Sequence, residues 1–568
     1  QEGVQLADIN GDGRIDLVAK LGTAQGDFRY FTIEEGLSFS SSIPLDNNPS
    51  FDFEDPEVRL LDVTGDGRSD VVRTAPGEIL VYKNLTGGSF SDGEVLPPID
   101  ENMGISFSDT AHVKLADMNG DGLVDVVYLR SGSVIYWPQK GKGEFDLPVE
   151  MGQSPLFEPQ ETLECQDLNG DGLGDLVRVG INRVDYWLHR GNGAFSEMQS
   201  LTDTPYRDPT STSIHYADMN GNGSTDIVWV DVTLGPEGAW RYLDLIGQNK
   251  PGLMKRIQNG LGKDVSIEYS SSGEMWGEDR ARGDAWNTNL PVPVQVVRQI
   301  TISDSLGNET VSRLWYRNGR YDGEHREFRG FSQVIQTDEG DENTPTLLTT
   351  SEFDTGLMDK ARQGLLLLQT KEDESGAVFQ EVENTYSLAS LITGTDGRVV
   401  RHPRLQKKET RLYEKQGTPK TLLEEFVYDD FGNVTEKYQW GEIADGGVDS
   451  DPSYGKDERI TLTAYAINEA DWILDRVSSV EVQDAQGNVY RKKRLYYDGA
   501  DYEGLPLGEV THGLLKREEA LRKESFEPND PEPGDTGSDQ WIPIKRMAHD
   551  LWGNIIAIKD PRETLRTI

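Results

Sequence analysis

A short pattern rich in acidic residues and glycine occurs five times in the first 226 residues and constrains the possible folds more than any other feature. Each copy reads Asp-x-(Asn/Thr)-Gly-(Asp/Asn)-Gly-x-x-Asp, and successive copies begin 54, 55, 50 and 51 positions apart. Every copy runs into an apolar segment typical of a β-strand. Such a regular interval indicates one structural unit repeated along the chain. The copies cover residues 8–16, 62–70, 117–125, 167–175 and 218–226.

The spacing of polar side chains within each copy suits a hard divalent cation. Ca²⁺ takes roughly six to eight oxygen ligands, and side chains at loop positions 1, 3 and 5 converge on one ion only if the backbone curls tightly. Glycines at positions 4 and 6 permit this curl. Position 7 varies in type, as expected where only its carbonyl is used, and position 9 is Asp in every copy. We therefore predict about five Ca²⁺ sites.

The predicted ligands are positions 1, 3, 5, 7 and 9 of each loop. We expect the fifth loop to bind most weakly, because an amide replaces the carboxylate at its position 5. The complete set is Asp8, Asn10, Asp12, Arg14, Asp16, Asp62, Thr64, Asp66, Arg68, Asp70, Asp117, Asn119, Asp121, Leu123, Asp125, Asp167, Asn169, Asp171, Leu173, Asp175, Asp218, Asn220, Asn222, Ser224 and Asp226.

Two other kinds of loop share these features. An EF-hand loop begins in the same way but needs a bidentate Glu at position 12 and flanking helices. Position 12 here is Ala19, Arg73, Tyr128, Arg178 or Trp229, within strand-like sequence, which excludes an EF-hand. The alternative that remains is a metal-free turn rich in Asp, Asn and Gly, and it is strongest for the fifth loop.

A repeat of this length, with about four strand segments and a loop between two of them, suits one blade of a β-propeller. A solenoid of similar period is the less favoured alternative. The motif resembles the FG-GAP/VCBS calcium repeats of integrin-like propellers. Aromatic residues recur at one place in the repeat, and we expect them to pack between blades rather than to form a sugar-binding ring. They are Tyr82, Tyr136, Trp137, Tyr186 and Trp187.

Beyond Trp229 the acidic pattern stops and a different set of segments begins. They are Lys-Pro-Gly-Leu at 250–253, Asn-Gly-Leu-Gly at 259–262 and Arg-Glu-Phe-Arg-Gly-Phe at 326–331. Together they resemble the middle region of the B component of bacterial Tc insecticidal toxin complexes. With the repeats on either side, this resemblance covers nearly the whole chain.

A second, looser repeat occupies the C-terminal half. Its pattern is Asp-x-x-Gly-Asn between β-rich segments, and Gly and Asn tolerate the positive φ of a hairpin turn. The sequence Tyr428-Asp429 before one copy resembles the YD motif of RHS/YD-repeat proteins. The copies lie at 304–308, 429–433, 484–488 and 550–554, with a degenerate copy at 373–377.

The resemblance implies an all-β chain: an incomplete propeller over residues 1–248, a connecting β region over 249–340 and an RHS/YD shell segment over 341–568. It implies a secreted, noncatalytic scaffold that encloses a toxic polypeptide. A C component would complete the shell, and the propeller would dock on a pore-forming A component. A calcium-dependent surface adhesin or lectin is the alternative. We also expect the chain to be a segment of a longer protein.

Composition narrows the function classes. The formal net charge of −43 opposes binding to nucleic acid or to anionic lipid surfaces. No run of about 18 apolar residues is present. The single cysteine, Cys165, has no partner for an internal disulfide and is expected to be an unreactive core thiol.

No catalytic pattern is found. The seven histidines form no metal-hydrolase spacing, and neither a Gly-x-Ser-x-Gly elbow nor a phosphate-binding loop is present. The pair Glu424-Glu425 is expected to be surface rather than a glycosidase pair, and Asp560-Pro561 is too short to indicate self-cleavage. An Arg-Gly-Asp tripeptide at 282–284 is expected to be coincidental. We therefore predict that the chain is not an enzyme.

Overall fold

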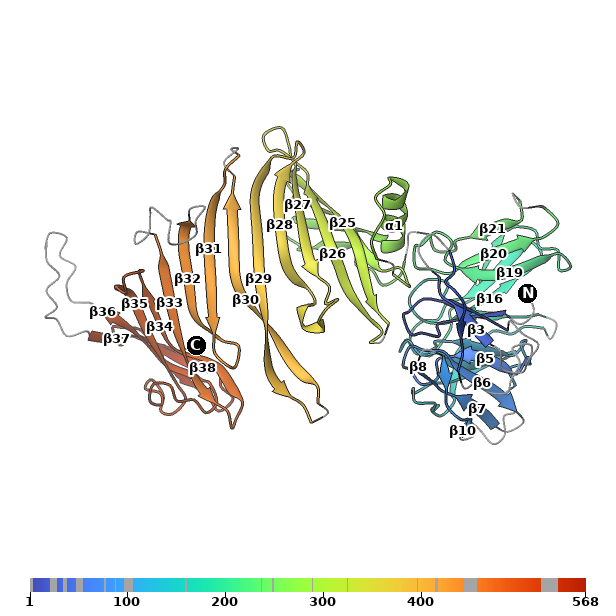
Figure 1. Cartoon of the computed structure of the whole chain (residues 1–568), viewed down its shortest axis with the longest axis horizontal. Coiled ribbons are helices and arrows are strands. Elements are labelled where there is room, and N and C mark those ends of the chain that lie inside the picture. The colour runs from blue at the N-terminus through green and yellow to red at the C-terminus, as the bar shows by residue number, and fades with distance from the viewer. Residues whose placement is uncertain are drawn as a thin grey trace. The chain divides into compact units, whose positions relative to one another are not determined.

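The computed structural model confirms the predicted all-β class, with one α-helix and one 3₁₀ turn among the described residues. The chain forms two compact units, Gln1–Val334 and Ile335–Ile568 (Figure 1). No described helix is long and apolar enough to span a membrane. The structure describes residues 4–20, 28–33, 38–46, 55–75, 78–86, 88–96, 106–158, 161–235, 238–247, 250–288, 290–323, 325–395, 397–413, 417–443, 457–522 and 540–567.

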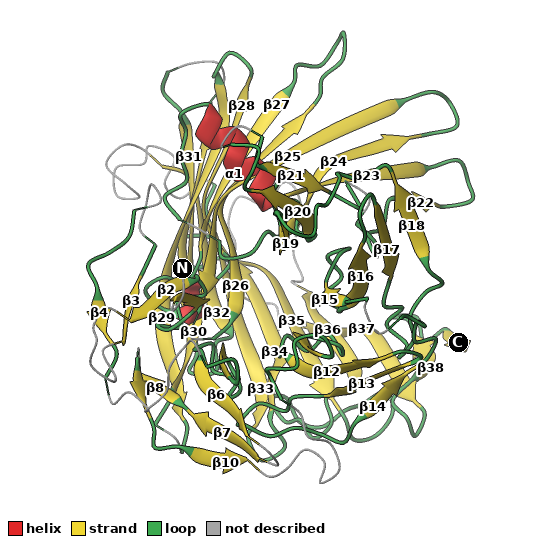
Figure 2. Ribbon diagram, turned by 90° about the vertical axis from the view of Figure 1, so that its right-hand side faces the viewer, coloured by secondary structure: helices red, strands yellow, loops and turns green. Residues whose placement is uncertain are grey.

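Five small antiparallel sheets follow one another in the first unit, one for each acidic motif, and lie side by side around a common centre (Figure 2). We call them blades one to five. The strands are, for blade one, β1 (Val4–Ala7), β2 (Asp16–Lys20), β3 (Phe28–Phe31) and β4 (Ile43–Pro44); for blade two, β5 (Val58–Leu61), β6 (Asp70–Ala75), β7 (Glu78–Tyr82) and β10 (Glu94–Leu96), with the hairpin β8 (Asn84–Thr86) and β9 (Ser89–Phe90); for blade three, β11 (Val113–Ala116), β12 (Asp125–Arg130), β13 (Ser133–Trp137) and β14 (Val149–Met151); for blade four, β15 (Glu164–Gln166), β16 (Asp175–Val179), β17 (Arg183–Trp187) and β18 (Gln199–Thr202); and for blade five, β19 (Thr212–Ala217), β20 (Asp226–Asp231) and β21 (Trp240–Leu243).

Apolar side chains fill the spaces between consecutive blades. Four buried clusters join blade one to two, two to three, three to four and four to five. Trp137 and Tyr186 lie in such clusters, which confirms the expectation that the recurrent aromatics pack between blades. Cys165 is buried in the cluster of blades three and four, and burial raises the pKa of its thiol, as expected for an unreactive core residue.

After blade five, eighteen strands form one antiparallel sheet in strict sequence order. They are β22 (Arg256–Gln258), β23 (Asp264–Ser271), β24 (Gln295–Ser303), β25 (Glu309–Asp322), β26 (Glu327–Asp338), β27 (Leu347–Asp354), β28 (Leu365–Asp373), β29 (Val378–Thr393), β30 (Val399–Leu412), β31 (Lys420–Tyr428), β32 (Val434–Ile443), β33 (Arg459–Asn468), β34 (Ile473–Gln483), β35 (Val489–Tyr497), β36 (Leu515–Arg522), β37 (Gln540–His549), β38 (Ile555–Lys559) and β39 (Leu565–Thr567).

The Asp-x-x-Gly-Asn pentapeptides are hairpin turns, as predicted. In the turn between β31 and β32, one carboxylate oxygen of Asp429 accepts from the backbone N–H groups of Phe431 at 3.0 Å and Asn433 at 2.8 Å. Its other oxygen accepts from the Asn433 side chain at 2.9 Å. Asp560 makes the same two backbone contacts, with Arg562 and Thr564, so Asp560-Pro561 belongs to one more turn of this kind.

The helix α1 (Ser272–Ala281) connects β23 to β24, and a 3₁₀ turn, η1 (Lys360–Arg362), lies between β27 and β28. A capping box starts α1, in which Ser271 accepts from the Glu274 N–H at 3.0 Å and Glu274 accepts from the Ser271 N–H at 3.1 Å. In its last turn, buried Asp279 accepts from the indole N–H groups of Trp286 at 2.8 Å and Trp315 at 3.1 Å.

We predict that Asp279→Ala weakens the connecting region strongly. The substitution removes the acceptor of the buried Trp286 indole and of the half-buried Trp315 indole, and one of the two carboxylates that pair with Arg317, which lies 3.2 Å from Asp279. We expect the free energy of unfolding to fall by about 3 kcal/mol. Denaturant titration followed by tryptophan fluorescence measures this loss.

The matched control is Asp284→Ala, because Asp284 also pairs with Arg317, at 2.7 Å, but is solvent-exposed. An exposed ion pair contributes little, so the control should unfold like the unsubstituted chain. Equal effects of the two substitutions would contradict the assignment of Asp279 as the buried anchor.

Candidate functional site

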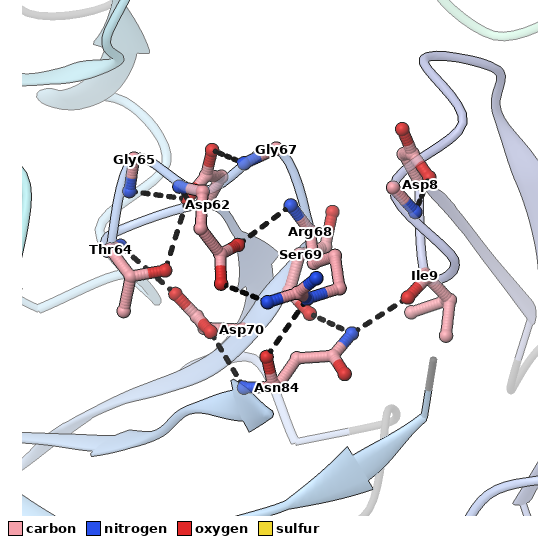
Figure 3. Close-up of polar contacts among 12 residues, drawn as sticks. Asp8, Ile9, Asp62, Thr64, Gly65, Gly67, Arg68, Ser69, Asp70 and Asn84 are labelled. Atoms are coloured by element: carbon pink, nitrogen blue, oxygen red, sulfur yellow. Dashed lines mark hydrogen bonds and ion pairs between the residues drawn. The ribbon is translucent and has the colours of Figure 1, made fainter. Parts of the chain in front are cut away.

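The first residue of every acidic motif holds the loop in its curled form. Its two carboxylate oxygens accept hydrogen bonds from the backbone N–H groups of positions 4 and 6. In the second loop, Asp62 accepts from Gly65 at 2.7 Å and from Gly67 at 2.9 Å (Figure 3). The other four loops repeat both contacts at 2.7–2.9 Å. Gly65 and Gly67 have φ of 75° and 89°, the left-handed region that favours glycine.

The aspartate at position 9 is fully buried in all five loops and closes the loop from its other end. One of its oxygens accepts from the N–H of position 2 at 2.8–3.1 Å in every loop. In blades two, three and four, the other oxygen accepts from a backbone N–H fourteen residues further on, at 2.6–2.8 Å. Position 9 therefore ties each loop to its own blade.

The residue that donates this last hydrogen bond escaped the sequence analysis. It is Asn84, Gln139 or His189, always two residues after the recurrent aromatic, which is the signal that could have identified it. The Asn84 side chain reaches the preceding blade and donates to the Ile9 carbonyl at 2.8 Å (Figure 3). Gln139 likewise donates to the Asp62 carbonyl at 3.0 Å. These side chains therefore connect the acidic loops of neighbouring blades.

Burial of the position-9 carboxylates perturbs their protonation. Desolvation, reinforced by neighbouring carboxylates, raises the pKa of Asp16, Asp70, Asp125 and Asp226 to about 6. The pKa of Asp175 rises to about 8 for the same reasons. One oxygen of Asp16 and one of Asp226 have no hydrogen-bond partner within the described parts of the chain. The loops thus concentrate negative charge where water is scarce.

The side chains of each loop are chemically suited to a hard cation, since each nine-residue loop contains carboxylate oxygens together with amide or hydroxyl oxygens. The side chains at positions 3 and 5 mostly accept from the loop's own backbone, as Asp121 does from the Leu123 N–H at 2.8 Å. Over the described ranges, no three His, Cys, Asp or Glu side chains are grouped so as to hold a metal. The loop backbones are curled as predicted. To bind an ion, the side chains at positions 3 and 5 must rotate away from the backbone N–H groups that they now contact.

Basic side chains lie on the second loop. Arg68, at position 7, forms an ion pair of 2.6 Å with Asp66 at position 5. Arg326, from the turn between β25 and β26, lies 3.4 Å from Asp62 and donates to the Gly122 carbonyl of the third loop at 2.9 Å. The sequence pattern placed Arg68 at position 7 with only its carbonyl in use, and it gave no indication of Arg326. The two guanidinium groups already neutralise part of the charge that a metal ion would neutralise.

The fifth loop is contacted by the connecting region. Lys250 donates to the Gly223 carbonyl at 3.3 Å, and Gln295 donates to the Asn222 carbonyl. Ser271, the N-cap of α1, donates to the Gly221 carbonyl. The loops therefore also serve as a docking surface for the region that follows the blades.

Other candidate residues have structural partners. Glu424 pairs with Lys437 at 2.7 Å, whereas Glu425 accepts from the Trp440 indole at 2.7 Å. Neighbouring residues of a strand point to opposite faces, so the two carboxylates do not share a site. In the Arg-Gly-Asp tripeptide, Arg282 pairs with Glu278 at 3.0 Å, and Asp284 is paired as described above.

Comparison with known proteins supports the predicted resemblance. Residues 189–361 match the family model described as the insecticide toxin TcdB middle/N-terminal region. A solved Photorhabdus luminescens Tc holotoxin pore, in a mutant form, covers 100% of this chain at 20% identity with a TM-score of 0.75, and the match covers 34% of that chain. The resemblance to Tc toxin B components is thus confirmed. No curated protein matches the sequence significantly.

Two further structures share the fold. TcdB2-TccC3 matches 98% of this chain at 18% identity, with a TM-score of 0.64 and coverage of 36% of that chain. TcdB2-TccC3 without its hypervariable C-terminal region matches 100% of this chain at 17% identity, with a TM-score of 0.62 and coverage of 38% of that chain. The present chain therefore spans little more than a third of the length of these structures.

We predict that position 9 stabilises the loops independently of any metal. In Asp175→Asn, a single carbonyl oxygen replaces the two oxygens that accept from Leu168 and His189, and the new NH₂ group faces a backbone donor. We expect a loss of about 2 kcal/mol in local stability. Hydrogen exchange of residues 163–187 in chelator-treated protein measures this loss.

The matched control is Asp171→Asn in the same loop, since Asn retains the oxygen that accepts from Leu173 at 3.0 Å. Its exchange rates should stay close to those of the unsubstituted chain. Equal acceleration in both variants would show that position 9 has no special structural role.

Proposed function

We propose that the chain is a noncatalytic scaffold of a secreted toxin complex. Residues 1–248 form the propeller that docks on a pore-forming A component, residues 249–340 the connecting region, and residues 341–568 part of an RHS/YD-repeat shell. A shell-completing C component closes the wall around a toxic polypeptide. The match of residues 189–361 to the toxin family and the shared fold over the whole chain support this proposal. In this role the chain binds neither nucleic acid nor membrane.

The observation that carries the proposal is that the long sheet is polar on both faces. On one face, Glu424 of β31 lies between Lys408 of β30 at 3.6 Å and Lys437 of β32 at 2.7 Å. On the opposite face of β30, Arg411 pairs with Glu383 of β29 at 2.8 Å and with Glu409 of β30 at 2.7 Å.

Most antiparallel sheets bury one face against a core. In β28, β29, β30 and β32 every described side chain is at least partly exposed. Cross-strand ion pairs and hydrogen-bonded turns, rather than a core, hold such a sheet together. A sheet with two polar, solvent-exposed faces suits a wall that has solvent on one side and an enclosed polypeptide on the other.

The absence of a recognisable reaction centre in the described parts of the chain is compatible with this role. The acidic side chains of the blades are engaged in loop closure, and the paired glutamates of β31 face opposite ways. A scaffold needs shape and surfaces rather than a reactive group.

The test is reconstitution with a C-type and an A-type component of a Tc complex. We expect the chain and the C-type component to co-purify as one particle whose enclosed polypeptide resists added protease. The C-type component alone is the control and should leave that polypeptide digestible. Failure to co-purify, together with binding to a glycan array, would instead favour the adhesin or lectin alternative.

We also propose that the acidic loops bind Ca²⁺ through the FG-GAP/VCBS-like ligand set at positions 1, 3, 5, 7 and 9. The first, third and fourth loops are the strongest candidates, because each has carboxylates at positions 1, 5 and 9. The second loop is weakened by Arg68 and Arg326, and the fifth loop by Asn222. The ion supplies positive charge that neutralises the loop carboxylates and so stiffens the blades.

We predict that millimolar Ca²⁺ raises the melting temperature of the chain. With a dissociation constant of about 10⁻⁴ M, each site contributes about 1.4 kcal/mol. The combined substitutions Asp12→Asn, Asp121→Asn and Asp171→Asn should remove most of the increase. Scanning calorimetry with Ca²⁺ or with chelator measures it.

The matched control is Asp66→Asn in the second loop, where Arg68 already pairs with the carboxylate. This variant should keep most of the Ca²⁺-dependent increase. A melting temperature that is the same with Ca²⁺ and with chelator would contradict the metal proposal and leave the scaffold proposal untouched.

A further inference from the structure

The fifth acidic loop lacks one of the three carboxylates that each of the other loops has at positions 1, 5 and 9. Asn222 stands at position 5, so the motif itself contributes only Asp218 and Asp226. The affinity of a Ca²⁺ site depends on the charge of its ligands, and an amide oxygen is a weaker ligand than a carboxylate. By its motif alone, the fifth loop is therefore short of one negative charge.

A carboxylate from outside the motif contacts the fifth loop. One oxygen of Asp244 accepts from the side-chain amides of Asn220 at 2.9 Å and Asn222 at 2.9 Å, which are motif positions 3 and 5. Its other oxygen accepts from the backbone N–H groups of Ile246 at 3.1 Å and Gly247 at 2.6 Å. Asp244 is thus fixed by its own segment, and it lies on two loop positions at which ligand oxygens are expected.

The strand register shows that this carboxylate is peculiar to blade five. In every blade the residue after motif position 9 pairs with a residue of the third strand, as Ile227 pairs with Leu243 in blade five. Asp244 is the next residue after that partner. The residues at the same place in blades one to four are not acidic, and they are Thr32, Lys83, Pro138 and Leu188. The blade whose motif lacks the position-5 carboxylate is therefore the blade that has a carboxylate here.

The buried aspartate at position 9 gives independent evidence for a ligand in this loop. In blades two to four, its second oxygen accepts from a backbone N–H of the segment that follows the third strand. Asp226 is 0% exposed, and its corresponding oxygen has no hydrogen-bond partner among the residues that the structure describes. Asp244 begins the equivalent segment of blade five. Burial, reinforced by the negative charge of Asp244, raises the pKa of Asp226. A buried oxygen without a donor, close to a second carboxylate, indicates a place for a cation.

The amide of Asn220 can turn toward an ion without unfolding the loop. Its oxygen accepts from the Asn222 N–H at 3.0 Å, but that N–H also donates to Asp218 at 3.1 Å. A half-turn of the Asn220 amide therefore leaves this N–H with an acceptor, presents the amide oxygen on the side of Asp244 and frees one position on the Asp244 carboxylate. Asn222 can stay in place, because its oxygen accepts from the Ser224 N–H at 2.8 Å while its NH₂ group holds Asp244.

We propose that Asp244 is a ligand of the fifth loop and replaces the missing carboxylate of position 5. With Asp218, Asn220 and Asp226, it offers a hard divalent cation such as Ca²⁺ three carboxylates and an amide oxygen. Each of the other loops has the same number of carboxylates. Asn222 positions Asp244 through its NH₂ group. This inference rests on the proposed Ca²⁺ binding of the loops and extends it to a residue outside the motif.

The experiment measures hydrogen exchange of residues 212–231 and 240–247 in the full chain, with Ca²⁺ and with chelator. With a dissociation constant of about 10⁻⁴ M, about 1 mM Ca²⁺ should slow exchange about tenfold in the unsubstituted chain. Asp244→Asn keeps the size of the side chain and one oxygen but removes the charge, so we expect it to abolish most of this slowing. The first, third and fourth loops should respond to Ca²⁺ as before.

A second variant separates a ligand role from a purely structural one. The double substitution Asn222→Asp with Asp244→Asn moves the carboxylate to position 5, where the other loops have it. It should restore the slowing by Ca²⁺ to about tenfold, because the fifth loop again has three carboxylates. If Asp244→Asn acted only by loosening the segment 244–247, the double variant would remain unresponsive.

The matched control is Asp231→Asn, at the other end of β20. This carboxylate accepts from the Thr233 N–H at 2.9 Å, outside the acidic loop. Its substitution should leave the Ca²⁺ response of the fifth loop unchanged.

Three results would overturn the proposal. The first is equal protection of the fifth loop by Ca²⁺ in the unsubstituted chain and in Asp244→Asn, which would exclude Asp244 as a ligand. The second is a double variant that does not recover. The third is a fifth loop that Ca²⁺ leaves unprotected while it protects the others, which would keep the proposed Ca²⁺ binding of those loops and make Asp244 a structural cap. If Ca²⁺ protects no loop, the proposed Ca²⁺ binding itself fails and this proposal fails with it.

Discussion

The hydrogen bonds that a few buried aspartates accept from backbone N–H groups underlie the whole N-terminal unit. The carboxylate at position 9 is removed from water, and it can be accommodated there only because the backbone supplies donors on both sides. Those donors come from the loop and from the segment just after the third strand of the same blade. Closure of the loop and pairing of the strands are therefore coupled. Each blade satisfies its own loop hydrogen bonds and needs a neighbouring blade to cover its apolar face.

The second half of the chain is stabilised in a different way. A sheet that is wet on both faces cannot depend on a core for its order. Its register is set instead at the turns, where a carboxylate such as that of Asp484 binds the N–H groups of Gln486 and Asn488. Ion pairs of Lys, Arg and Glu then join neighbouring strands on both faces. This construction suits a wall, and it explains why a chain with net charge −43 has long strands without a continuous apolar interior.

Within the first unit, the connecting region makes polar contacts with the acidic loops. There the guanidinium of Arg326, the amine of Lys250 and the hydroxyl of Ser271 reach oxygen atoms of the acidic loops. The same loops are the proposed Ca²⁺ sites, so the metal proposal concerns the same surface that seats the connecting region. The basic side chains on the second loop provide part of the positive charge that balances its carboxylates. The five loops are therefore not equivalent, despite their nearly identical sequences.

The regular recurrence of the acidic motif determined the succession of five sheets. The sequence alone also determined the curled loops and the hairpin turns, because each depends on hydrogen bonds within about ten residues. Asp62 with Gly65 and Gly67, and Asp429 with Asn433, are examples. It could not reveal Asn84 reaching Ile9, Asp279 binding Trp315, or Arg326 beside Asp62, since these partners are 75, 36 and 264 positions apart. Only the tertiary structure decided which faces are covered and which aromatic side chains, such as Trp240, are exposed. Burial depends on what packs against a face, and a residue's own neighbours in the chain do not specify that.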